Sequence, residues 1–403
     1  MFCAAFISKN HSPTNVGKRR IVAASPTWWV TSILIACACV VSADTRRPIT
    51  QETFRLWSGP PIPSRAEQIP FVPGLREQTI HQATENSDKF LHGAAIIQYQ
   101  GTLFANWANS PTHENGPQET LRGRRSTNLG LSWSALETIA PGFDGEERHS
   151  HGILFEHDGQ LWTISARFGN GTRGRRFPGL KAEAFVFHSN TNQWEPKGIA
   201  MHNCWPYDEP VRMPNGNAIT GGQDRNGLPV VAISHGKNFL EWDTVNIPYP
   251  PRLKPSYAET TVWANDATVT AIIRGGEKVA WVSTSHDFGE TWETAKPSNF
   301  PMPRAKAYAG TLSSGQRYLL ANLYDRNTLV IAVSAPGETT LSQLWRIRHG
   351  PSKPPRFTGR AKSKQWSYPY GHEFASNLYV VYSIGKEDCG LSILPVKSLA
   401  TDH

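Results

Sequence analysis

Residues 283–292 read STSHDFGETW, and this stretch predicts a tight hairpin between two β-strands. Asp287 can hydrogen-bond the local backbone, Gly289 can take the positive φ of a tight turn, and Trp292 can pack beneath it. A less perfect copy, RSTNLGLSW, spans residues 125–133. We therefore expect a structural role for both stretches.

A longer unit recurs around these two stretches: a short apolar strand, a polar or glycine turn, and a second, aromatic-rich strand. Its turns fall at Gly101, Gly159, Gly216, Asp266, Gly315 and Asn377. Successive turns are 49 to 62 residues apart, which is enough for one four-stranded blade with its loops. No 3.6-residue apolar stripe predicts a long helix. The sequence therefore predicts an all-β fold, a six-bladed β-propeller of four-stranded antiparallel blades.

The two ends of the chain are expected to meet in the last blade, because such closure hides the free sheet edges. The final strand of that blade is predicted at residues 391–396. We expect the segment Thr53–Ser58, which precedes the first unit, to add a strand beside it.

The first 43 residues have the three-part layout of a secretory signal peptide. Lys18, Arg19 and Arg20 precede an apolar run over residues 28–41, and small residues follow at 41–43. We expect a signal peptide at 1–43, a propeller domain at 44–403, and a secreted or periplasmic protein. Residues 34–37, LIAC, also resemble a lipoprotein signal, which would make the protein lipid-anchored. No later segment is long and apolar enough to cross a bilayer.

Charge and cysteine content narrow the possible partners. The net charge of +8 falls to +4 without residues 1–43, because that segment holds four basic residues and no acid. No Lys/Arg run predicts nucleic-acid binding, and scattered arginines suit discrete anionic ligands. Cys204 and Cys389 have neither C-x-x-C nor zinc spacing. We expect a monomer without a metal or a cofactor.

The two hairpin stretches resemble the Asp boxes, or BNR repeats, of the sialidase (neuraminidase) superfamily. Asp boxes also occur in non-enzymatic propellers, so function has to be argued from the site. The resemblance implies a glycosidase with a tyrosine nucleophile, a glutamate that activates it, and an acid that protonates the leaving oxygen. It also implies arginines that hold the carboxylate of the sugar.

The resemblance assigns these roles along units four to six. Glu259 and Arg274, which flank the fourth hairpin, correspond to the activating base and to one carboxylate-binding arginine. Arg326 in the fifth unit corresponds to a second arginine. Tyr368 in the sixth unit is the expected nucleophile, with Tyr370 as the alternative.

The first unit supplies the acid and departs from the family pattern. Glu114 stands where sialidases usually carry aspartate, and Glu119 is the alternative. The family has an arginine in its first-blade motif, whereas residues 90–93 here read FLHG. We expect His92, or an arginine from another loop, to fill that space.

A second departure is the cluster RHSH at residues 148–151, with Arg167 in the next strand. His151 and Arg167 are candidate substrate-binding residues alongside His92. Structural hydrogen bonding is the alternative reading of the same histidines.

The sequence thus predicts an exo-acting glycoside hydrolase that releases a terminal acidic sugar from a glycan with retention of configuration. One alternative is a polysaccharide lyase or other uronic-acid-glycan hydrolase on the same propeller, with His92 or His151 in the chemistry. The other is a glycan-binding propeller without catalytic activity.

Overall fold

The structure of the chain, a computed structural model, describes residues 52–143, 147–171, 176–251, 255 and 257–400. The predicted signal peptide, residues 1–43, lies outside the described residues. Within these ranges, no helix has the length and apolar character that a membrane span needs.

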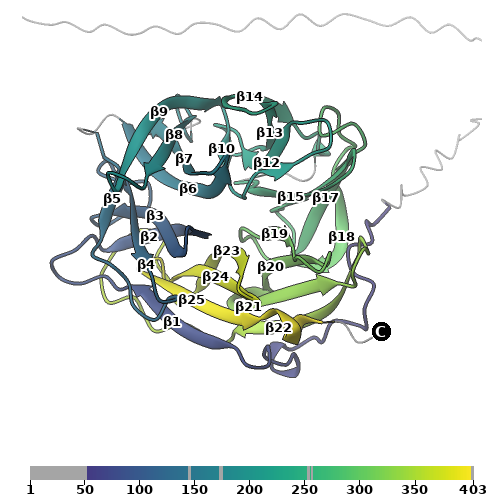
Figure 1. The fold of residues 1–403 in the computed structure, drawn as a ribbon. Coiled ribbons are helices and arrows are strands. Elements are labelled where there is room, and N and C mark those ends of the chain that lie inside the picture. The colour runs from purple at the N-terminus through teal and green to yellow at the C-terminus, as the bar shows by residue number, and fades with distance from the viewer. Residues whose placement is uncertain (1–51, 144–146, 172–175, 252–254, 256, 401–403) are drawn as a thin grey trace, which may run out of the picture. The chain divides into compact units, whose positions relative to one another are not determined.

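Six antiparallel sheets form the fold, and their innermost strands surround one central axis (Figure 1). Neighbouring inner strands contact one another all the way round the ring, including the contact of the sixth sheet with the first. The predicted six-bladed propeller is therefore confirmed. Blade one consists of β2 (Phe90–Tyr99), β3 (Thr102–Ser110), β4 (Thr120–Ser126) and β5 (Glu137–Ala140). Blade two consists of β6 (Glu147–His157), β7 (Gln160–Gly169), β8 (Lys181–His188) and β9 (Gln193–His202). Blade three consists of β10 (Trp205–Pro206), β11 (Val211–Arg212), β12 (Ala218–Gln223), β13 (Pro229–His235) and β14 (Asn238–Asn246).

Blades four to six repeat the pattern, and each predicted turn joins the first two long strands of its blade. Two short 3₁₀ helices, η1 (Ala66–Gln68) and η3 (Val396–Leu399), complete the described elements. Blade four consists of β15 (Thr260–Asn265), β16 (Thr268–Ile273), β17 (Val279–Ser285) and β18 (Lys296–Pro301). Blade five consists of β19 (Tyr308–Thr311), β20 (Arg317–Leu323), β21 (Asp325–Ser334) and β22 (Leu341–Arg348). Blade six consists of β23 (Trp366–Phe374), β24 (Asn377–Ile384), β25 (Asp388–Pro395) and β1 (Arg76–His81).

Burial falls from the axis to the rim, which explains the composition of the strands. The inner strand β2 is buried along nearly its whole length, because other blades cover both of its faces. The outer strand β9 is mostly exposed or half-buried. The inner strand β2 is therefore almost continuously apolar, whereas the outer strand β9 carries polar side chains.

The predicted closing strand was wrong. β1, at Arg76–His81, pairs with β25 and closes the sixth blade, whereas Thr53–Ser58 does not. Phe54 and Trp57 form only single bridges to Ser298 and Leu341, on the outer strands of blades four and five. The apolar side chains of this segment suggested a strand, but they serve to cover those two blades. β1 is a rim strand and shows little apolar alternation.

Both predicted hairpins have the expected local geometry. Asp287 accepts hydrogen bonds from Ser285 Oγ (2.7 Å) and the Thr291 amide (2.9 Å), and Gly289 has φ +89°. Trp292 Nε1 donates to the Gly289 carbonyl (2.8 Å). The Thr291 hydroxyl also donates to Asp287 Oδ2 (2.5 Å), and this bond is the first of the hydrogen bonds to Asp287 that lower its pKa to about 2. In the other copy, Asn128 accepts the equivalent bonds from Ser126 and Ser132.

The direction of each strand decides at which end of the propeller the following loop lies. Successive antiparallel strands reverse direction, so the six repeated turns and the two Asp boxes share one end. The starts of the inner strands, and the loops between second and third strands, share the other end. That second end holds most of the predicted site residues.

Candidate functional site

A cavity of about 230 Å³ lies at this second end of the axis, where all six blades contribute to its wall. Of the predicted site residues, seven line it together: Tyr368, Glu259, Glu114, Arg274, Arg326, His92 and His151. The other lining residues are Asn115, Phe177, Trp205, Tyr207, Gln223, Tyr257, Ala361 and Lys386. We call this cavity the axial pocket.

A hydrogen-bonded chain of three side chains occupies one wall of the axial pocket. The Tyr368 hydroxyl donates to Glu259 Oε1 (2.8 Å), and Arg274 Nη1 donates to Glu259 Oε2 (2.5 Å). Glu259 precedes β15 and Arg274 follows β16, so the two residues face each other across the end of one hairpin. Burial raises the pKa of Tyr368, with the charge of Glu259 as the next cause. The tyrosine is therefore a neutral hydroxyl held against a carboxylate.

Irregular pairing turns three inner-strand side chains into the axial pocket. The register of β2 shifts between His92 and Ala95, that of β6 between His149 and Gly152, and that of β23 between Ser367 and Tyr370. Such bulges re-aim side chains next to active sites. Tyr368, in the third bulge, has φ +59°, which is rare for a bulky residue.

His92, His151 and Tyr368 pack into one aromatic cluster. The His92 ring lies 4.3 Å from the Tyr368 ring and 4.7 Å from the His151 ring, between centroids. Gly93 is required here, because a Cβ on it would lie 2.1 Å from His151 Cγ. Burial is the main cause that lowers the pKa of both histidines well below its ordinary value. Both imidazoles are thus neutral at pH 7.

Arg326 leaves hydrogen-bonding capacity open toward the axial pocket. Its Nη1 donates to Gln365 Oε1 (2.9 Å) and its Nη2 to the Arg304 carbonyl (2.7 Å). Among the described residues it forms no ion pair, and its guanidinium carbon lies 5.9 Å from the Tyr368 ring centroid. This arginine can therefore accept an anionic partner.

Glu114 reaches the axial pocket from the loop between β3 and β4. Its Oε1 accepts a hydrogen bond from Lys386 Nζ and lies 3.2 Å from His92 Nε2. Glu119, the alternative acid, does not line the pocket. Its Oε2 accepts the Asn115 amide (2.7 Å), so it holds the loop that carries Glu114. Burial raises the pKa of Glu119 to about 7.

Arg167 and Tyr370 lie away from the axial pocket. Arg167 pairs with Glu147 (2.6 Å) and Glu183 (3.0 Å), between the strands of blade two. The Tyr370 hydroxyl donates to the Leu154 carbonyl (3.0 Å) within the core. Each residue has protein partners that account for its polar groups.

Lys386 is the main site residue that sequence reasoning missed, together with Tyr207, Tyr257 and Gln223. It lies in the turn between β24 and β25, and only 3% of its surface is exposed. Because Glu114 comes from the equivalent loop of the first blade, a search of every loop between second and third strands could have found Lys386.

The family model of the BNR repeat-like domain matches residues 101–379, which is more than half of the chain. The chain belongs to this family. No curated protein matches the chain in sequence.

Solved structures share the fold of this BNR repeat-like domain at low sequence identity. A sialidase is 18% identical with a TM-score of 0.62, over 85% of this chain and 35% of its own. Trypanosoma rangeli sialidase is 12% identical with a TM-score of 0.61, over 81% and 60%. A Dyadobacter fermentans protein of unknown function is 14% identical with a TM-score of 0.60, over 80% and 99%. These likenesses show the fold alone.

A buried carboxyl group in this BNR repeat-like domain, Asp208, follows the pocket-lining residue Tyr207 and links two strands. It accepts hydrogen bonds from Thr220 (2.8 Å) and the Gly221 amide (2.7 Å) in β12. It also accepts Thr261 (2.9 Å) and the Val262 amide (2.7 Å) in β15. Burial raises the pKa of Asp208 to about 6. Because β15 follows Glu259 directly, Asp208 holds in place the strand next to Glu259.

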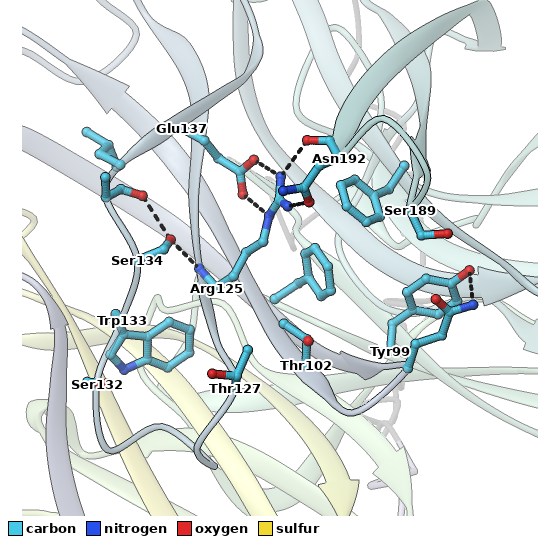
Figure 2. A pocket seen from close by; sticks show the side chains of 15 residues that line it. Tyr99, Thr102, Arg125, Thr127, Ser132, Trp133, Ser134, Glu137, Ser189 and Asn192 are labelled. Atoms are coloured by element: carbon cyan, nitrogen blue, oxygen red, sulfur yellow. Dashed lines mark hydrogen bonds and ion pairs between the residues drawn. The ribbon is translucent and has the colours of Figure 1, made fainter.

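A larger cavity, about 810 Å³, is a groove between blades one and two at the Asp-box end (Figure 2). Its central cation, Arg125, donates to Glu137 through Nε (2.8 Å) and Nη2, and to Asn192 through Nη1. The guanidinium also lies 4.4 Å from the Phe187 ring centroid. The contacts of Arg125 therefore join two blades, and its guanidinium charge is already paired with Glu137.

The described residues contain no group of three or more His, Cys, Asp or Glu side chains arranged to hold a metal ion. Cys204 and Cys389 are buried free thiols. The side chains that line the axial pocket include three phenols, two carboxyl groups, two imidazoles and three cations.

Proposed function

We propose that this chain is a sialidase-like exo-acting glycoside hydrolase that releases a terminal acidic sugar with retention of configuration. The observation that carries the proposal is the Tyr368–Glu259–Arg274 chain at the propeller axis. A tyrosine hydroxyl on a buried carboxylate is an arrangement that activates a nucleophile. The solved Trypanosoma rangeli sialidase complex with sialic acid supports the substrate class by analogy of fold.

The proposed reaction has two displacements. Tyr368 Oη attacks the anomeric carbon and passes its proton to Glu259, while Glu114 gives a proton to the departing glycosidic oxygen. A water molecule then attacks the anomeric carbon and gives a proton to Glu114, and the proton on Glu259 returns to Tyr368. Two inversions at one carbon give net retention.

The charge of the axial pocket favours a monoanionic sugar. Among the described residues, its wall carries the cations Arg274, Arg326 and Lys386 against the carboxylates Glu114 and Glu259. With both histidines neutral, the excess is one positive charge when Glu114 is ionised and two when Glu114 carries the proton that the reaction requires. A sugar carboxylate would lower this excess and could bind Arg326 directly.

The test is hydrolysis of a fluorogenic sialic-acid glycoside by the full chain, beside Tyr368→Phe. We expect turnover by the native chain and a loss of at least about 10³-fold in the variant. NMR of the first-formed product should show the retained anomer. An inverted first product would exclude the tyrosine mechanism.

A lyase is the second candidate, because His92 and His151 are buried neutral imidazoles beside Tyr368. A neutral imidazole can remove the proton next to a uronic carboxylate while an arginine neutralises that carboxylate. An unsaturated product that absorbs near 235 nm would identify this reaction. Saturable binding of acidic sugars without any turnover would instead identify a glycan-binding propeller.

Export from the cytoplasm is part of the same proposal. The signal-like residues 1–43 and a substrate on extracellular glycans are consistent with each other. N-terminal sequencing of the protein recovered from its native host should begin at Asp44, or at Cys37 if the lipoprotein signal is used.

A further inference from the structure

A lysine of the sixth blade lies beside the first-blade position at which the family pattern has an arginine. Leu91, at the position of that arginine, is fully buried in the core. Its backbone amide donates to the carbonyl of Lys386 (3.1 Å), so the two residues are direct neighbours across the junction of blades one and six. The lysine therefore enters the pocket beside the position from which the arginine is absent.

We propose that Lys386 binds the carboxylate of the sugar together with Arg326 and so completes the anion site. This inference rests on the proposed function, because it concerns the same pocket and the same acidic sugar. It adds a specificity-determining residue from a loop that the family resemblance does not point to.

The position of the ammonium supports this role. Lys386 Nζ lies 5.0 Å from the Tyr368 ring centroid, and the Arg326 guanidinium carbon lies 5.9 Å from the same centroid. Two cations therefore lie near the ring of the proposed nucleophile. A sugar whose anomeric carbon is at Tyr368 Oη would have its attached carboxylate within reach of both.

The ion pairs of the axial pocket show which cations are available. Arg274 is held by Glu259, and this pair is part of the nucleophile chain. Among the described residues, Lys386 has Glu114 as its carboxylate partner, and Arg326 has none. An incoming carboxylate can take the ammonium from Glu114, which frees Glu114 Oε1 to face the glycosidic oxygen.

The experiment must separate sugar binding by Lys386 from its hold on Glu114. The Glu114→Gln variant removes the carboxylate partner and leaves Lys386 free. We would measure, by titration calorimetry, the affinity of Glu114→Gln and of Glu114→Gln/Lys386→Met for two acids. These are DANA, the inhibitor seen bound to Trypanosoma rangeli sialidase, and D-glucuronate.

Loss of a charge-assisted hydrogen bond should weaken acid binding about 10- to 100-fold in the double variant. Lys386→Arg in the Glu114→Gln background should restore most of the affinity. For the methyl ester of DANA, which keeps the ring without the charge, the two variants should bind equally. Lys181→Met, which removes a lysine that pairs with Glu147 in blade two and does not line the pocket, is the control and should leave acid binding unchanged.

Equal affinity of the single and double variants for the acids would overturn the inference, even if the native chain hydrolyses sialosides. Conversely, Lys386-dependent binding of glucuronate without sialoside hydrolysis would support the inference and reject the sialidase proposal. Failure of the native chain to bind either acid would overturn both.

Discussion

Two glutamate–arginine pairs of this propeller differ in how many arginine nitrogens have a hydrogen-bond partner. In the groove between blades, Glu137 and Asn192 accept from every nitrogen of the Arg125 guanidinium. In the axial pocket, Arg274 gives only Nη1 to Glu259, and its buried Nε has no hydrogen-bond partner among the described residues. Glu259 also holds Tyr368. The first pair joins two blades, whereas the second leaves an arginine donor without a protein partner beside the axial pocket.

The largest expected effect is on turnover, and it should separate the two glutamates. Glu259→Gln removes the proton acceptor of Tyr368 and should lower kcat on an acidic glycoside by about 10²–10⁴-fold. Glu137→Gln makes the same change in the groove and should leave kcat within about twofold. Equal losses in the two variants would mean that Glu259 acts through stability and not through chemistry.

The next largest effect is on the free energy of unfolding, which should fall more on replacement of Arg274 than on replacement of Arg125. Arg274→Met leaves the Glu259 carboxylate, which is only 5% exposed, without its cation. Breaking a buried pair from one side costs about 3–5 kcal/mol. Urea unfolding of Arg274→Met and of Arg274→Met/Glu259→Gln should show that the second change recovers much of that loss. If the double variant recovers no unfolding free energy, the loss in Arg274→Met comes from packing and not from the unpaired carboxylate.

Much of the fold could be predicted from sequence because its signals are local. A turn such as Ser285–Trp292 contains its own hydrogen-bond acceptor, its glycine and its packing tryptophan, so about eight residues define it. The closing strand was wrong for the opposite reason. β1 lies at the rim, where one face is exposed, and its partner β25 is more than 300 residues away along the chain.

The site was predictable where two residues share one hairpin, as Glu259 and Arg274 do. Lys386 carried no such signal, because its partners Leu91 and Glu114 are far away in sequence. The bulge between His149 and Gly152 also resets the alternation of β6. The alternation of residues 148–151 therefore could not show that His151 faces the pocket. It also could not show that Arg167, in the neighbouring strand, pairs with other strands of its blade.

The buried carboxyl group of Glu119 extends the comparison, because no ion pair to it is present among the described residues. Burial is the main cause that raises its pKa from 4.5 to about 7. The groups near it are Ser150, Asn115, Glu114 and Arg148. The folded state thus binds a proton more tightly than the unfolded state.

The free energy of unfolding should therefore fall as the pH rises from about 4.5 to about 7. The contribution of Glu119 to this fall is about 3 kcal/mol, at 1.4 kcal/mol per pKa unit. Glu119→Gln should flatten the slope in urea unfolding measured at several pH values. Asp208, whose pKa burial raises to about 6, gives a slope of the same sign that should remain. An unchanged slope in Glu119→Gln would show that Glu119 is ionised throughout this range.

The smallest expected effect belongs to the groove, where Arg125 is satisfied but sits near the surface. Its side chain is 16% exposed, so water screens the pair with Glu137 and the pair stabilises the fold by about 1 kcal/mol or less. Stacking on Phe187 adds about 0.5–1 kcal/mol. Arg125→Met should therefore lower the unfolding free energy by about 1–2 kcal/mol and leave the KM for an acidic glycoside unchanged. A raised KM would instead make this groove a second sugar-binding surface. Unpartnered arginine donors would then no longer distinguish the axial pocket from the groove.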